Sequence, residues 1–311
     1  MSKIENRKSR AVQWRGALDP RPSTLDNAFS LVEVLVVVSL LSLIVLALMA
    51  VFNSTQRAFR AGITQTDVLE GGRATMDLIT SDLRAMSPSA GVSNSAINTP
   101  VNFYAVVKFN FQPLLQPLVA SSQQRTNVLE DFFILSRNNQ TWTGTGYVVD
   151  PYSTNFVNPL YRFTISTNIQ AASPMVLYTN FAIRVNNNNF TNMSHLMNGV
   201  VHLTVRAYDQ NGFWMNNNTN NDGGQPATNN NVLFLPSAYG EVGFYMFSNT
   251  LPSSVEVQLA ALEDRTLQRA ESLADISPVF SRSNYLSGQS GKLHLFRQRV
   301  SISNVDPTAF Q

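Results

Sequence analysis

One carboxylate stands inside the most apolar stretch of this sequence. Residues 29–52 read FSLVEVLVVVSLLSLIVLALMAVF, and Glu33 is the only charged residue among them. A lone carboxylate within a membrane-spanning helix costs about 2.5–3.5 kcal/mol on insertion scales, so such a residue is expected to be partnered or functional. Two interpretations of Glu33 are open from the residues alone. Either it has a partner inside the membrane, or it reaches water, since it lies only four residues into the segment.

Side chains that often carry catalysis or bind metal do not cluster in the sequence. His195, His202 and His294 are widely separated, and none has a second ligand at metal-binding spacing. The chain has no cysteine, which excludes disulfides, thiol catalysis and Cys-ligated metal sites. No nucleophile elbow, zinc-protease, P-loop or dinucleotide motif is present. The sequence therefore predicts no enzyme, no cofactor and no metal, and a net charge of +2 does not favour nucleic-acid binding.

Glu33 belongs to the apolar run, which is long enough to form a membrane-spanning helix. As a helix, residues 29–52 span about 36 Å, enough to cross a hydrocarbon core of about 30 Å. The segment 1–28 before it is polar and basic, and no basic residue follows the run until Arg57. The excess of cations before the run predicts a cytoplasmic N-terminus, one membrane pass over 29–52, and a C-terminal part outside.

A second helical pattern continues beyond the membrane run. Residues 53–86 contain no proline, and a stripe of apolar side chains recurs at helical spacing. The stripe comprises Leu69, Met76, Ile79, Leu83 and Met86. Charged residues lie off this stripe, and Ser87-Pro88 predicts the end of the helix. We therefore expect an amphipathic helix over 53–87 that packs on the following domain.

Residues 88–311 have the texture of a β-rich domain. Short runs of β-forming residues are separated by Asn, Gly, Ser and Pro. They predict strands near 101–111, 131–136, 160–166, 175–184, 199–208, 254–262 and 292–302, and a surface helix over 262–275. The expected fold class is α+β: a long N-terminal helix packed on a mostly antiparallel β-sheet domain.

The junction between the basic segment and the apolar run resembles the type III signal of type IV pilins and type II secretion pseudopilins. In that pattern a glycine precedes phenylalanine, apolar or hydroxyl residues follow, and glutamate is the fifth residue after the cut. The residues FSLVEVL, 29–35, match it position by position, and Ala28 stands where glycine is usual. The resemblance implies a cleaved leader, 1–28, with processing between Ala28 and Phe29 and N-methylation of the new Phe29 amine.

The same resemblance implies a role for Glu33 in assembly. The amine created on Phe29 would lie at the membrane depth of Glu33 in a neighbouring, axially shifted subunit. Charge pairing at low dielectric would then stabilise assembly and set the register between helices. The implied partners are a prepilin peptidase that is also an N-methyltransferase, other minor pseudopilins or pilins, the major subunit and the inner membrane. Residues 88–311 would form a pilin-like domain in the periplasm.

Later segments resemble a narrower group, minor pseudopilin J and PilW-type minor pilins. The similar segments are GGRATMDLITSDLRAMS (71–87), LPSSVEVQLAALED (251–264) and FRQRVSISN (296–304). These resemblances imply a minor pseudopilin-like structural subunit of a type II secretion pseudopilus, within the filament or at its tip. Two alternatives stay open: a PilW-type minor pilin used in adhesion, motility or DNA uptake, and a signal-anchored periplasmic binding protein for which 29–52 is only a tether.

Overall fold

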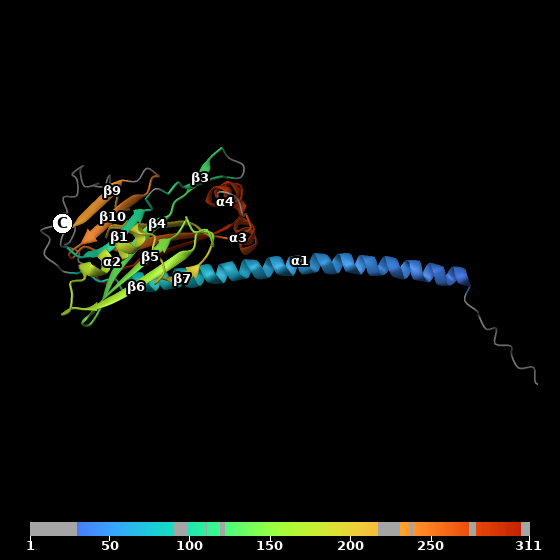
Figure 1. Cartoon of the computed structure of the whole chain (residues 1–311), viewed down its shortest axis with the longest axis horizontal. Helices are drawn as coiled ribbons and strands as arrows, with labels where there is room; N and C mark the ends of the chain where they lie inside the picture. The colour runs from blue at the N-terminus through green and yellow to red at the C-terminus, as the bar shows by residue number, and fades with distance from the viewer. Residues whose placement is uncertain are drawn as a thin grey trace, which may run out of the picture. The chain divides into compact units, whose positions relative to one another are not determined.

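The computed structural model describes residues 30–89, 99–109, 111–118, 122–216, 231–236, 239–273 and 278–305. Residues 1–57 form one unit and residues 58–311 a second. The helices are α1 (Leu31–Arg84), α2 (Met175–Asn186), α3 (Asp264–Glu271) and α4 (Pro278–Ser287), with a short 3-10 turn η1 (Ser290–Lys292) (Figure 1). The strands in chain order are β1 (Val101–Val107), β2 (Leu114–Pro117), β3 (Gln124–Asn127), β4 (Glu130–Asn138), β5 (Thr141–Val149), β6 (Leu160–Asn168), β7 (Ser194–Met197), β8 (Val200–Tyr208), β9 (Val232–Pro236), β10 (Val242–Phe247), β11 (Ser254–Leu262) and β12 (Leu293–Ser301).

Helix α1 is continuous over 54 residues, which confirms the long N-terminal helix. No proline interrupts it, and Arg84 in its last turn places a cation where the helix dipole favours one. Met86 then forms an isolated β-bridge with Ser136 of β4. The helix ends at Arg84, before the predicted end at Ser87, and Ser87, which precedes a proline, is not helical.

Two antiparallel sheets make up most of the second unit. The larger has seven strands in the order β7-β6-β5-β4-β1-β10-β9, and the smaller has three in the order β12-β11-β8. A short bridge between Leu129 and Leu203 links the start of β4 to β8. A separate hairpin is formed by β2 and β3. With α1 before them, these sheets confirm the predicted α+β class.

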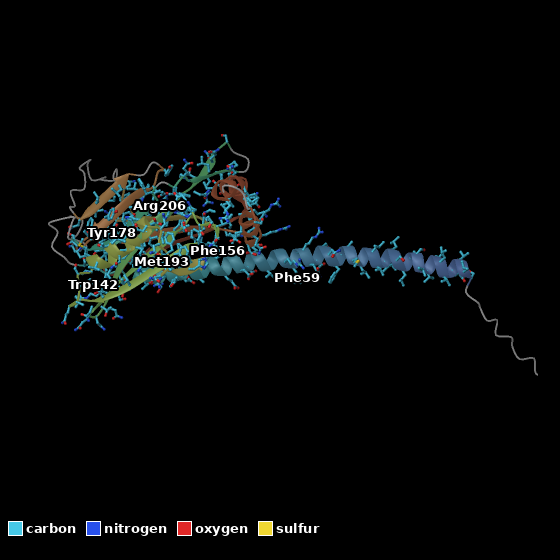
Figure 2. The ribbon with its side chains drawn as sticks, in the orientation of Figure 1. Phe59, Trp142, Phe156, Tyr178, Met193 and Arg206 are labelled. Carbon is cyan, nitrogen blue, oxygen red and sulfur yellow. The ribbon has the colours of Figure 1, made fainter. Side chains whose placement is uncertain are left out.

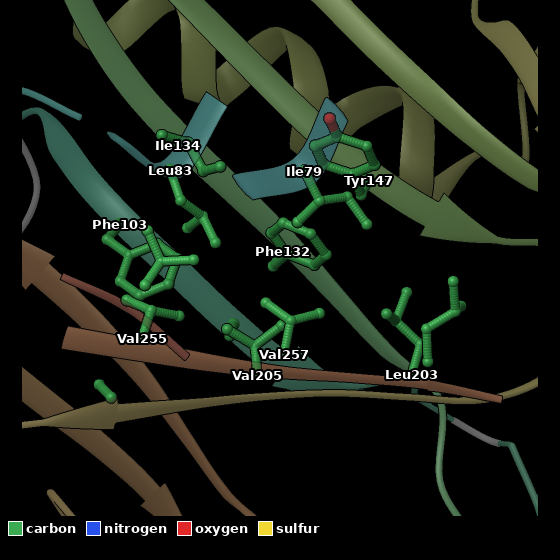
Figure 3. Packing of buried hydrophobic residues seen from close by; sticks show 14 of the residues in the cluster. Ile79, Leu83, Phe103, Phe132, Ile134, Tyr147, Leu203, Val205, Val255 and Val257 are labelled. Atoms are coloured by element: carbon green, nitrogen blue, oxygen red, sulfur yellow. The ribbon is translucent and has the colours of Figure 1, made fainter. Parts of the chain in front are cut away.

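The main core lies between the two sheets and α1. Phe103 and Phe132 contribute from the large sheet, Val205 and Val257 from the small one, and all four are buried (Figure 3). Ile79 and Leu83 of α1 belong to the same cluster (Figure 3). Each strand of the small sheet thus gives its apolar face to a core that α1 completes.

Helix α2 corrects one prediction, because residues 175–184 were expected to form a strand. Leu177 and Phe181 are one helical turn apart, and both are buried in a second apolar cluster on the large sheet. Pro174 lies at the helix start, where its missing amide proton is not needed. Spacing by four residues therefore prevails over the β-branched and aromatic composition of this run.

Strand β5 was not predicted, because its glycines have the appearance of turn residues. Gly144 and Gly146 lie beneath α2, and a Cβ atom at Gly146 would come within 2.3 Å of the Phe181 ring. At Gly144 a Cβ would meet Phe133 at 2.8 Å and Leu177 at 2.9 Å. The glycines allow close approach of the helix to the sheet.

The two C-terminal helices close a third apolar cluster at one end of the small sheet. Ala270 of α3 and Leu286 of α4 are buried with Leu262 of β11 and Leu114 of β2. The predicted helix 262–275 is present in shorter form as α3, since Leu262 ends β11. Predicted strands at 101–111, 131–136, 160–166, 199–208, 254–262 and 292–302 correspond to β1, β4, β6, β8, β11 and β12.

Candidate functional site on helix α1

The N-terminal end of α1 places Glu33 in a capping box. The Ser30 amide donates to Glu33 Oε2 at 2.9 Å, and the Glu33 amide donates to Ser30 Oγ at 3.2 Å. These reciprocal bonds satisfy two amides that the first turn leaves unpaired. Sequence reasoning missed this role, although Ser-x-x-Glu before an apolar run is its usual signature. Glu33 therefore has a local function besides the one that the resemblance implies.

The residues expected to be processed, Ala28 and Phe29, lie outside the described residues. Cleavage after Ala28, methylation of Phe29 and pairing of its amine with Glu33 thus stay predictions. The capping bonds use only Ser30 and Glu33, both of which would remain after removal of 1–28.

The apolar part of α1 is long and apolar enough to span a membrane. Its side chains are exposed on every face, with Leu31 at 81% and Leu46 at 69% of full exposure. A core helix of a soluble protein would bury them. Ser39 and Ser42 donate their hydroxyls to the carbonyls of Val36 and Val38, each at 2.8 Å. Serines that bond within their own helix can face lipid at low cost.

The C-terminal part of α1 is held by its apolar stripe. Met76, Ile79, Leu83 and Met86 are buried in the main core, and Leu69 is half-buried. Most charged residues off the stripe are exposed, and Asp82 alone among those from Asp67 to Arg84 is half-buried; the exposed ones are Asp67, Glu70, Arg73, Asp77 and Arg84. This confirms the amphipathic pattern for the end of the helix. Nearer the membrane run, by contrast, Phe59 and Ile63 stay exposed, at 69% and 60% (Figure 2 labels Phe59).

A polar contact fixes the rotation of this helix against the large sheet. Arg162 of β6 donates to both carboxylate oxygens of Asp82, at 2.9 and 3.0 Å. The hydroxyl of Tyr147, on β5, donates to Asp82 Oδ2. Burial, and next the hydrogen bond to Asp82, raise the pKa of Tyr147, which keeps this buried hydroxyl protonated as a donor. Asp82 belongs to the Asp-Leu-Arg run of the resemblance, but the sequence alone did not predict its partners.

Further bonds close the end of the helix. The Ser87 amide donates to the Leu135 carbonyl at 2.9 Å, and Asn304 Nδ2 donates to the Met86 carbonyl at 2.9 Å. The residues that follow the last turn are therefore tied to β4 and to the segment after β12. Gly72 adds a close approach, because a Cβ there would come within 2.3 Å of the Phe296 ring. The neighbouring Gly71 has open space at that position.

Two buried ionisable side chains elsewhere accept hydrogen bonds from backbone amides where the two sheets meet. Glu130 Oε2 accepts from the Val205 amide at 2.6 Å, and burial raises the pKa of Glu130 well above its usual value. His202 Nδ1 accepts from the Val128 amide at 3.1 Å, and burial lowers the pKa of His202 to about 4. Each side chain thus takes the place of a backbone carbonyl as the partner of a buried amide, which is a structural role.

The three histidines have separate partners. His195 bonds to Asn198 at 2.7 Å, while His294 of β12 lies 3.6 Å from Glu263, the residue before α3. Across the ranges that the structure describes, no three His, Asp or Glu side chains converge as a metal site would require.

Three comparisons with known proteins gave no match. No family model matches the chain. No curated protein and no solved structure matches it either. The structure itself shows a pilin-like architecture: a long N-terminal apolar helix packed on antiparallel β-sheet.

Proposed function

We propose that this chain is a minor pseudopilin-like structural subunit, which assembles through α1 into, or at the tip of, a type II secretion pseudopilus. The observation that carries the proposal is the divided character of α1. One continuous helix is apolar on all faces in its first part and anchored by an apolar stripe and Asp82 in its last part. Such a helix suits a subunit whose apolar part can move from lipid into contact with other subunits while its domain stays folded.

The proposal includes processing and placement. A prepilin peptidase would remove 1–28 and methylate Phe29, and the single-pass chain would keep its N-terminus in the cytoplasm and residues 88–311 in the periplasm. Its partners would be that peptidase, other minor subunits and the major subunit. Support comes from the FSLVEVL junction and the basic segment before it. We propose no enzymatic activity.

A PilW-type minor pilin of a type IV pilus is the close alternative. It rests on the same residues, 29–35 and 71–87, so neither the helix nor the domain separates the two. Linked genes distinguish them, because the two machines use different secretin, ATPase and major-subunit sets. A signal-anchored binding protein is the more distant alternative, and it predicts indifference to the charge of Glu33.

The capping box allows the charge of Glu33 to be tested apart from its cap. Glutamine at the third helical position can also cap, so Glu33→Gln keeps the cap and removes the charge. Ser30→Ala does the reverse, since it removes the capping oxygen and keeps the carboxylate. Glu33→Ala removes both. Each variant is expressed with its assembly system, and recovery in sheared filaments is compared with recovery in membranes.

We expect Glu33→Gln and Glu33→Ala to insert in the membrane and to lose assembly, whereas Ser30→Ala assembles. The reason is that only the carboxylate can pair with the Phe29 amine of a neighbour. Assembly of Glu33→Gln at the wild-type level would restrict Glu33 to capping and would remove its proposed role between subunits.

A further inference from the structure

The small sheet ends in a long strand, β12, that has one open edge. In the described residues β12 pairs with β11 alone. The Ile302 amide donates to the Ser253 carbonyl at 3.0 Å, and the Glu263 amide donates to the Lys292 carbonyl at 3.0 Å. These bonds at both ends of the register show that the even-numbered residues bond to β11. The amides and carbonyls of Leu295, Arg297 and Arg299 therefore point away from it.

This edge is long enough to accept another strand. β12 has nine residues, against four in β7 and five in β9, the strands at the two edges of the large sheet. Natural proteins usually keep exposed edges short or protect them with charge, because an open row of backbone groups is a template for pairing. A nine-residue edge is not protected by shortness, so its charge decides which strands could pair with it.

The side chains along the edge are basic. Residues 292–302, KLHLFRQRVSI, carry three cationic side chains and no acidic one, and Lys292, at 53% exposure, lies 3.5 Å from Glu263. Arg297 pairs with Glu256 at 2.8 Å, yet its side chain is 61% exposed. Arg299 stacks its guanidinium over Tyr208 and donates to the Ser254 hydroxyl. Leu295, which precedes Arg297 on β12, is 49% exposed.

The charge pattern selects a partner. Like charges opposite one another destabilise a strand pair, so a second copy of β12 is disfavoured at this edge. Acidic side chains opposite Arg297 and Arg299 would instead be attracted. Main-chain bonds to the edge supply affinity, and the alternate side chains supply the choice of partner.

We propose that the open edge of β12 binds an extended acidic segment of another protein, which adds as a fourth strand to the small sheet. This inference is independent of the proposed assembly through α1. Glu33 variants leave it untouched, and failure of strand addition leaves the proposed function standing.

The test uses the full chain in detergent and a synthetic peptide. The peptide has nine residues of alternating glutamate and threonine, to match the length of β12. A matched peptide carries lysine in place of glutamate. Hydrogen-bonded cross-strand partners share a face, so glutamates opposite Arg297 and Arg299 would bond to β12 through their own amides. N-methylation of the glutamate amides should therefore block binding, while N-methylation of the threonine amides should not.

Two readouts are combined: fluorescence anisotropy of the labelled peptide, and hydrogen exchange of the protein amides. We expect the glutamate peptide to bind at least about tenfold more tightly than the lysine peptide, with an affinity that falls as salt is added. The amides of Leu295, Arg297 and Arg299 should become protected from exchange when the peptide is bound.

A pair of variants tests the edge without altering charge. Leu295→Pro removes one outward amide, which proline at a sheet edge allows, whereas Leu295→Thr keeps that amide. We expect Leu295→Pro to weaken peptide binding by about tenfold and Leu295→Thr to bind like wild type, with equal melting temperatures. Equal binding by the lysine peptide, no protection at about 1 mM peptide, or protection that appears with protein concentration alone would overturn the proposal. The last result would assign the edge to a second copy.

Discussion

The two parts of helix α1 differ in how their apolar residues are distributed around the helix. In residues 31–52 apolar side chains cover the whole circumference, and none of the strongly apolar stretch is buried within the chain. From Met76 to Leu83 they form one buried stripe; of the two charged residues beside it, Asp77 is exposed and Asp82 is half-buried in its contact with Arg162. The share of the helix circumference that is apolar therefore determines what the helix packs against. A single stripe is buried by the chain's own sheets, whereas a helix that is apolar all round requires lipid or other subunits.

The largest expected effect breaks the stripe. Leu83→Asp places a carboxylate in the main core with no cation to pair with it, and should lower the free energy of unfolding by roughly 3–5 kcal/mol. The measurement is a thermal melt of the full chain in detergent, followed by tryptophan fluorescence. Ile63→Asp is the matched control on the same helix, because Ile63 is 60% exposed. Equal melting temperatures for the two variants would remove the proposed packing.

A smaller effect should follow from the polar anchor. Asp82→Asn leaves Arg162 without its carboxylate and should cost about 1.5–3 kcal/mol of stability, the range for a hydrogen bond to a charged group. Arg162→Met, and the double variant, complete a double-mutant cycle in chemical denaturation. We expect the two single effects to be strongly non-additive, since both side chains share one contact. Additive losses would mean that Asp82 is coupled to Tyr147 and not to Arg162.

The smallest effect separates two adjacent glycines. Gly72→Ala should destabilise by about 1 kcal/mol, because the new methyl group meets the Phe296 ring, which must turn aside. Gly71→Ala should stabilise by up to about 1 kcal/mol, since alanine favours the helix and the space is open. Denaturation midpoints of the two variants are compared with wild type. A shift of the same sign in both would show that Phe296 does not rest on Gly72.

Periodicity predicted most of the fold where one face of an element is buried. The stripe of α1 and strands such as β11, with alternate apolar residues, follow from spacing alone. The run 175–184 failed because its composition favours a strand, while Leu177 and Phe181 form a helical contact with the sheet. β5 was missed because Gly144 and Gly146 are explained only by α2, which covers them. Both errors arise from a contact between segments that are distant in sequence.

The candidate site was predicted unevenly for a similar reason. The charge of Glu33 stood out within the apolar run, but its bonds to Ser30 were not predicted, although the local Ser-x-x-Glu pattern indicates them. Asp82 could be placed on the helix, whereas its partners Tyr147 and Arg162 lie 65 and 80 residues further along the chain. No local pattern encodes such a pairing.

The most direct test of the central claim is the intact mass of membrane-extracted protein, produced with and without a prepilin peptidase. We expect loss of residues 1–28 and gain of one methyl group on Phe29, and only in the presence of the peptidase. A full-length mass in both samples would contradict it, because α1 would then keep its leader and lack the free amine that is proposed to pair with Glu33.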